Sequence, residues 1–189
     1  MIGGTKAIAG RVSGVSRKDR IRAADITSAA IHFLLRGRAA TALAMLDQAL
    51  ALDNTEPRAL AGKAMAMCQL GDSRAGVEVA DRALILHPSS GVIYNARGFC
   101  YGRMGDHVRA VADFEKAVAV SPDDYNVYYN FACYCCGRGE DERARAYLKL
   151  AFEKGPAILP ALAERDPDLA RYRDERWFRE MAPPGPAIE

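Results

Sequence analysis

The side chains best suited to chemistry in this sequence are five cysteines. They are Cys68, Cys100, Cys133, Cys135 and Cys136. Cys133 and Cys136 would share one face of a helix, where a thiolate pair could bind a soft metal ion. Zinc needs four convergent ligands, and neither a second Cys-x-x-Cys pair nor a histidine at matching spacing is present. We therefore predict no cofactor and expect the cysteines to pack as small apolar residues; a metal- or redox-responsive module is the alternative.

Known catalytic signatures are missing from the sequence. It contains no Gly-x-x-x-x-Gly-Lys phosphate loop, no Gly-x-Ser-x-Gly motif and no His-Glu-x-x-His motif. The carboxylate pairs Asp123–Asp124 and Asp166/Asp168 stand where helices are expected to begin, and helix capping explains them. The sequence therefore predicts a protein that is not an enzyme and has no small-molecule substrate.

Composition and the chain ends indicate the compartment. No apolar run is long enough to span a membrane, and the stretch from Met1 to Ala24 lacks the uninterrupted apolar segment of a secretory signal. An odd number of cysteines without such a signal indicates a reducing compartment and no structural disulfides. The abundance of alanine and arginine favours a bacterial source. These features predict a cytoplasmic, bacterial protein.

Positive charge is concentrated at the N-terminal end. The first 24 residues carry six lysines and arginines against one acid, whereas the whole chain has a net charge of only +2. We expect residues 1–22 to form a flexible basic tail. A basic arm that contacts nucleic acid or an acidic surface, and a targeting peptide, are the alternatives. Because the only basic excess lies in this tail, nucleic acid is not the expected partner.

A repeat of 34 residues organises the rest of the chain. Four glycines mark it: Gly37, Gly71, Gly105 and Gly139. Small residues stand seven positions before and five positions after every glycine: Ala30, Ala64, Gly98 and Ala132, and Ala42, Gly76, Ala110 and Ala144. The residues eleven, seven and four positions before the glycine share one helical face, as do those five, nine and twelve after it. Each unit is therefore predicted to be a hairpin of two closely packed helices.

The glycine and a later proline explain where each helix ends. Glycine can adopt the left-handed conformation that ends a helix and turns the chain, without the steric penalty of a Cβ atom. Proline stands seventeen residues after the glycine in three units, as Pro88, Pro122 and Pro156. Proline stops the second helix because it lacks an N–H group and disfavours a helical predecessor.

These features resemble the tetratricopeptide repeat family. The unit from Val92 to Pro122 matches its pattern best, with Tyr94, Gly98, Tyr101, Gly105, Ala110, Phe114, Ala117 and Pro122. The resemblance covers residues 23–158 and implies four repeats, at 23–56, 57–90, 91–124 and 125–158. The implied fold is all-α, a right-handed α-α superhelix of four helix-turn-helix units. An unrelated alanine-rich bundle would not explain four units in unbroken register.

The period ends after Pro156, and a different segment follows. Asp166-Pro167-Asp168 is a strong helix start, and Leu169, Tyr172, Trp177, Phe178 and Met181 then supply an apolar side. A stacked array leaves its last apolar face bare. We therefore expect residues 159–182 to form a C-terminal capping helix, or lid, and the proline-rich residues 183–189 to form a loose end.

In this family the first helices of successive units line a concave groove. By this resemblance, the residues expected to contact a partner are Ile31, Leu35, Met65, Asn95, Phe99, Arg103, Tyr129, Asn130 and Cys133. The set is largely apolar, with Met65, Phe99 and Tyr129 as anchors, and an exposed apolar surface of this kind marks a binding site. Arg103 is its only basic member, which disfavours recognition of a peptide's terminal carboxylate. Asn95 and Asn130 could each hydrogen-bond a ligand backbone.

The resemblance implies a protein-protein interaction scaffold or adaptor that binds a peptide or helix of a partner protein in this groove. The alternative is a homo-oligomeric, chaperone-like subunit that fills its own groove.

Overall fold

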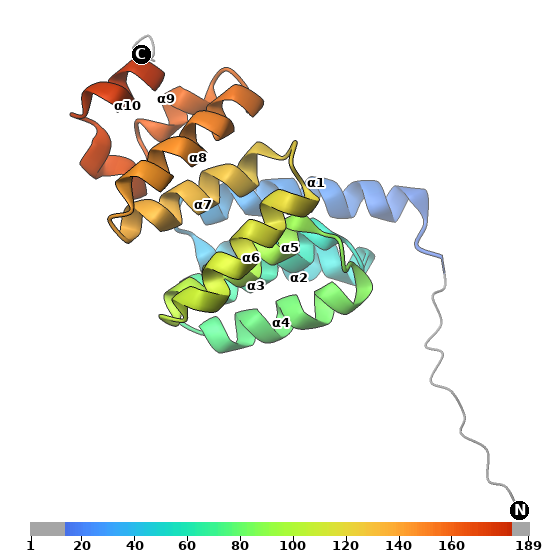
Figure 1. Ribbon diagram of the computed structural model, residues 1–189. Helices are drawn as coiled ribbons and strands as arrows, with labels where there is room; N and C mark the ends of the chain where they lie inside the picture. Colours follow the sequence, from blue (N-terminus) through green and yellow to red (C-terminus); the bar gives the residue numbers. More distant parts are fainter. Residues whose placement is uncertain (1–13, 183–189) are drawn as a thin grey trace, which may run out of the picture.

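The computed structural model describes residues 14–182, and all of its regular structure is helical (Figure 1). The expectations for the first thirteen residues and for the loose end at 183–189 lie outside the described residues. The elements are α1 (Arg17–Leu35), α2 (Ala39–Leu52), α3 (Pro57–Gln69), α4 (Ser73–Leu86), α5 (Gly91–Arg103), α6 (His107–Val120), α7 (Tyr125–Gly137), α8 (Asp141–Lys154), α9 (Leu159–Ala163), the 3₁₀ helix η1 (Pro167–Tyr172) and α10 (Arg176–Met181).

Eight of these helices form four stacked hairpins, which confirms the predicted fold class. α1 packs on α2, α3 on α4, α5 on α6 and α7 on α8. The first helices also pack on one another in succession, from α1 to α3, α5 and α7, whereas each second helix packs on the first helix of the next unit. The first helices therefore form one layer of the stack and the second helices form the other.

All four turn glycines have the backbone conformation that the repeat predicts. Their φ angles are positive, at 69° for Gly37, 99° for Gly71, 77° for Gly105 and 72° for Gly139. The residue after each glycine donates its N–H to a carbonyl in the last turn of the helix, as Asp106 does to Tyr101 at 3.0 Å. This is the Schellman arrangement, which satisfies carbonyl groups that the helix end leaves free.

Small residues let the two helices of a hairpin approach closely. A Cβ atom added to Gly76 would lie 2.7 Å from the carbonyl oxygen of Ala64 and 2.8 Å from the sulfur of Cys100. A Cβ atom added to Gly98 would lie 3.1 Å from the carbonyl oxygen of Ala110. The alanines at the same two positions of the repeat are fully buried: Ala30, Ala42, Ala64, Ala110, Ala132 and Ala144. Larger side chains cannot enter these positions without separating the helices.

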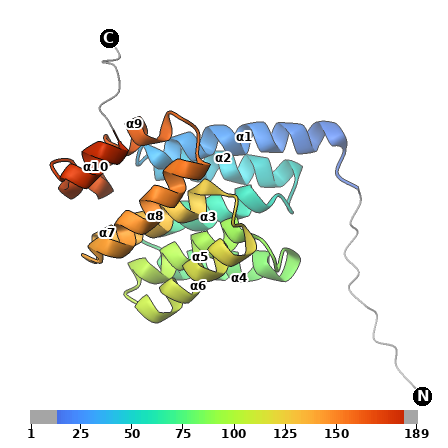
Figure 2. The same ribbon diagram turned by 45° about the horizontal axis from the view of Figure 1, so that its top comes forward.

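The first helix starts earlier than the sequence analysis expected. Residues 17–22 belong to α1 rather than to a tail, and α1 projects past its neighbours (Figures 1 and 2). Ser16 caps the helix, because its side-chain oxygen accepts a hydrogen bond from the backbone N–H of Asp19. Asp19 also places an acid in the first turn, where the helix dipole favours negative charge.

The C-terminal segment covers the fourth hairpin, but in three short pieces rather than one helix. η1 packs on α7, and α10 packs on α8 (Figure 1). Leu169, Tyr172 and Phe178 are buried in one cluster with Leu148 of α8. Pro160 and Pro167 each stand at the start of a new helix, where a missing N–H group is tolerated. The prolines therefore divide the segment, while its apolar side still covers the last hairpin.

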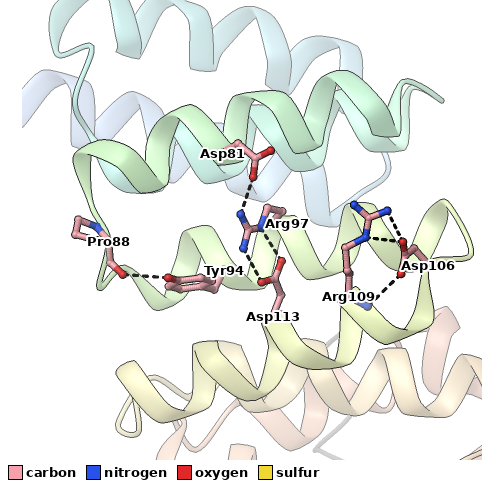
Figure 3. A network of polar contacts seen from close by, with 7 residues as sticks. All are labelled: Asp81, Pro88, Tyr94, Arg97, Asp106, Arg109 and Asp113. Carbon is pink, nitrogen blue, oxygen red and sulfur yellow. Dashed lines mark hydrogen bonds and ion pairs between the residues drawn. The ribbon is translucent and has the colours of Figure 1, made fainter.

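One arginine links the second and third hairpins (Figure 3). Arg97 on α5 makes a bidentate interaction with Asp113 of α6, at 2.7 and 2.8 Å, and a further bond of 2.6 Å to Asp81 of α4. Hydrogen bonding to Asp113 and Asp81 raises the pKa of Arg97 above its ordinary value. One unit earlier, Lys63 and Asp47 pair at 2.6 Å with the same spacing as Arg97 and Asp81. The sequence analysis missed these bridges, although the 34-residue period relates them.

The turn glycines give a prediction in which one substitution has opposite effects at two sites. Neither Gly105 nor Gly137 has a heavy atom within 4 Å of an added Cβ, but only Gly105 has a positive φ. We expect Gly105→Ala to lower the free energy of unfolding by about 1 kcal/mol, because alanine is strained there. Gly137→Ala should raise it by about 0.5 kcal/mol, because alanine restricts the unfolded chain. Urea titration measures both, and equal effects would contradict the turn assignment.

The arginine bridge gives a second prediction. Arg97→Met should destabilise the protein by about 2 kcal/mol or more, because it leaves the nearly buried carboxylate of Asp113 without its partner. Arg109→Met is the matched control, because it removes an exposed pair with Asp106 in the same hairpin and should have little effect. Thermal unfolding of the two variants compares them directly. Equal losses would show that Arg97 is no more than a surface residue.

Candidate partner-binding groove

The first helices, α1, α3, α5 and α7, carry all of the residues that the sequence analysis proposed for partner binding. Their exposure differs widely. Ile31, Met65, Phe99, Tyr129, Asn130 and Cys133 are half-buried; Leu35 and Arg103 are exposed; Asn95 is buried. Phe99 packs against core residues of both the second and the third hairpins, so it lies between two units of the stack.

A hollow of about 630 Å³ opens beside Phe99. Four segments of the chain surround it: the first turn with the start of α2, the end of α3, the C-terminal half of α5, and η1. Its lining residues are Gly37, Arg38, Ala39, Ala40, Thr41, Gln69, Leu70, Phe99, Arg103 and Asp168. Residues of the first unit and of the C-terminal segment thus line one opening. Phe99 and Arg103 are the two predicted site residues that line it.

The C-terminal segment covers another part of the predicted site. The hydroxyl of Tyr129 donates a 2.7 Å hydrogen bond to the carboxylate of Asp166, and the thiol of Cys136 donates one of 2.9 Å to the backbone carbonyl of Asp168. Burial raises the pKa of Tyr129, and the nearby carboxylates add to this effect. Tyr129 therefore binds the chain's own lid, a contact that its position in the repeat did not predict.

Asn95 carries an unsatisfied polar atom. Only 5% of the residue is exposed, and its side-chain oxygen has no hydrogen-bond partner among residues 14–182. A buried carbonyl oxygen without a donor is costly, and native proteins have few of them. Because this oxygen is buried, a ligand on the groove surface does not reach it in this conformation.

The cysteines of α7 are surrounded mainly by apolar groups. Burial raises the pKa values of the Cys133, Cys135 and Cys136 thiols, so these groups stay protonated at neutral pH. Cys68 and Cys100 are fully buried between the second and third hairpins. Cys100 donates a hydrogen bond to the backbone carbonyl of Ala64, and the thiol of Cys68 lies 3.1 Å from the hydroxyl of Ser73. The neighbouring thiol and burial raise the pKa of Cys100.

Within the described part of the chain, no group of three or more histidine, cysteine or acidic side chains is arranged to hold a metal ion. The absence of a resident metal stays a prediction.

The other two charged residues that line the hollow, Arg38 and Asp168, were not among the predicted site residues. Arg38 had a signal in the repeat, because the residue after the turn glycine is acidic in the other three units: Asp72, Asp106 and Glu140. Asp168 had none, because it lies outside the repeat.

None of the described helices is both long and apolar enough to cross a membrane.

The comparisons with known proteins agree with this architecture. The family model described as tetratricopeptide repeat matches residues 92–124, the unit that follows the pattern best. A solved thermophilic TPR protein of Thermus thermophilus is 22% identical, with 85% of this chain and 92% of that chain covered and a TM-score of 0.60. PilW, whose structure is titled as that of a widely conserved type IV pilus biogenesis factor, is 22% identical over 88% of this chain and 78% of its own, with a TM-score of 0.55. These likenesses concern the fold.

The lid gives a third prediction. Deleting residues 166–189 would uncover the apolar surface that Leu169, Tyr172 and Phe178 now bury. We expect the melting temperature to fall by at least about 5 °C and the protein to dimerise or aggregate. Light scattering and thermal unfolding measure these changes. Deleting residues 183–189 alone is the control and should change neither the melting temperature nor the oligomeric state. A chain of residues 1–165 that stays monomeric with an unchanged melting temperature would contradict the role of the lid.

Proposed function

Because the chain is a tetratricopeptide repeat protein, we propose that it is a non-catalytic scaffold that binds a segment of a partner protein through its first helices. The open hollow beside Phe99 is the observation that carries this proposal. Its volume is in the range of ligand-binding clefts, and it would hold several side chains of a peptide.

The surface around the hollow suits a peptide. Phe99 and Leu70 supply apolar contact area at the ends of α5 and α3, and Leu70 is 51% exposed. These apolar side chains would provide most of the affinity for a peptide, as in other modes of peptide recognition.

The contacts of the lid restrict the surface that a partner can use. Tyr129 and Cys136 are engaged by the lid residues Asp166 and Asp168. The surface left for a partner therefore lies on α1, α3 and α5 and includes Ile31, Leu35, Met65, Phe99 and Arg103. A second copy of the chain is the alternative occupant of this surface.

The fourth prediction tests this function. The wild-type protein should capture a specific partner from a cell lysate, and Phe99→Ala should weaken that capture about thirtyfold, the equivalent of about 2 kcal/mol. Arg103→Ala should reduce the capture less, because a peripheral charge acts mainly on the association rate. Purified partner and surface plasmon resonance give both numbers.

Leu86→Ala on α4 is the control, because Leu86 is an exposed apolar residue outside the hollow. Circular dichroism must remain helical in all three variants. Capture that is equal for wild type and Phe99→Ala would contradict the proposed surface. A dimer in light scattering that Phe99→Ala dissociates would favour the second copy.

A further inference from the structure

Two arginines on different walls of the hollow have no ion pair among residues 14–182. They are Arg38, at the first turn, and Arg103, at the end of α5. Both are exposed. Asp168 is the one acidic residue that lines the hollow, so the charged groups around this opening are two cations and one anion.

Arg38 is held at the edge of the hollow by its own hairpin. Its guanidinium carbon lies 5.0 Å from the centroid of the Phe33 ring, a distance typical of a cation–π interaction. Asp72 and Asp106, the equivalent residues of the next two units, each accept a backbone hydrogen bond and cap the second helix. Arg38 cannot do this, and α2 has neither a side-chain cap nor an acid in its first turn. The first unit thus presents a cation where the other units present an acid.

Arg103 lines the hollow from the end of α5. Burial and the nearby carboxylate of Asp166 raise the pKa of Asp168, and the charge of Arg103 partly offsets this rise. Asp168 and Arg103 nevertheless form no ion pair in the described structure, and the backbone carbonyl of Asp168 accepts a hydrogen bond from Cys136. The lid therefore brings a carboxylate near the arginine without forming an ion pair with it. Arg103 is exposed, so an incoming carboxylate could pair with it.

We propose that the hollow binds an acidic segment of a partner protein, with carboxylate side chains between Arg38 and Arg103 and a neighbouring apolar side chain against Phe99 and Leu70. This inference rests on the proposed function and adds the chemistry of the partner. Its main support is charge complementarity, because guanidinium groups bind carboxylates in preferred bidentate geometry. The chain's own N-terminal residues are rich in lysine and arginine, so they are poorly suited to a site that presents two arginines.

Selection from a phage-displayed library of random dodecapeptides tests the proposal without a known partner. We expect wild-type protein to enrich peptides that combine Asp or Glu with a large apolar residue. Synthetic copies of these peptides, measured by fluorescence anisotropy, should bind at least about tenfold more weakly to the double variant Arg38→Asp/Arg103→Glu. Their affinity for wild-type protein should also fall as NaCl is raised, because salt screens exposed charges.

The variants are chosen so that a loss of folding cannot explain the result. Aspartate is the residue that the second and third units carry at the position of Arg38, so Arg38→Asp should cap α2 and keep the hairpin intact. Arg74→Glu on α4 is the matched control, because Arg74 is exposed and does not line the hollow. It should leave the affinity of the peptides unchanged.

The outcomes separate this inference from the proposed function. Enriched peptides that are neutral or basic, and whose binding needs Phe99, would overturn the acidic partner and leave the groove in place. A second contrary result is that Arg74→Glu weakens the binding of acidic peptides as much as the double variant does. That result would also overturn the proposed acidic partner, because the attraction would then be nonspecific. If no enriched peptide depends on Phe99, the proposed function itself fails.

Discussion

The close approach of the two helices in each hairpin is the constraint on which the rest of the structure depends. Backbone atoms of one helix lie where a Cβ atom of the other would stand, as at Gly76 and Ala64. Contact at this distance leaves space for nothing larger than alanine or glycine, and it sets the angle at which the large residues beside it interdigitate. Because the same small positions recur every 34 residues, each hairpin repeats the geometry of the one before.

Stacking of these hairpins then decides which side chains can cooperate. First helices pack on first helices, so Met65 and Phe99 come from neighbouring units yet share one packed region. Ion pairs also join helices of neighbouring units. Arg97 reaches back to Asp81 of the preceding unit and across its own hairpin to Asp113, and it therefore couples two units that could otherwise open separately. Stability and the shape of the binding surface thus depend on the same interfaces.

The lid adds a function to what is otherwise an end cap. It buries the last apolar face, as an array of this kind requires, and it also brings Asp166 and Asp168 onto the surface formed by the first helices. One part of that surface is thereby occupied, and the open part is bounded by Asp168. The size and charge of the hollow therefore result jointly from the repeats and from the segment that follows them.

The hairpins could be predicted from the amino-acid sequence because their causes are local. A glycine at each turn, small residues at fixed offsets and a proline after most second helices all act within a few turns of helix. The start of α1 at Arg17 was also open to local reading, from Ser16 and Asp19, but was missed. Only the tertiary structure decided how Arg38, Arg103 and Asp168 meet around one hollow. Their meeting depends on how the hairpins stack and on the path of a lid divided by prolines, and neither is encoded in the repeat pattern.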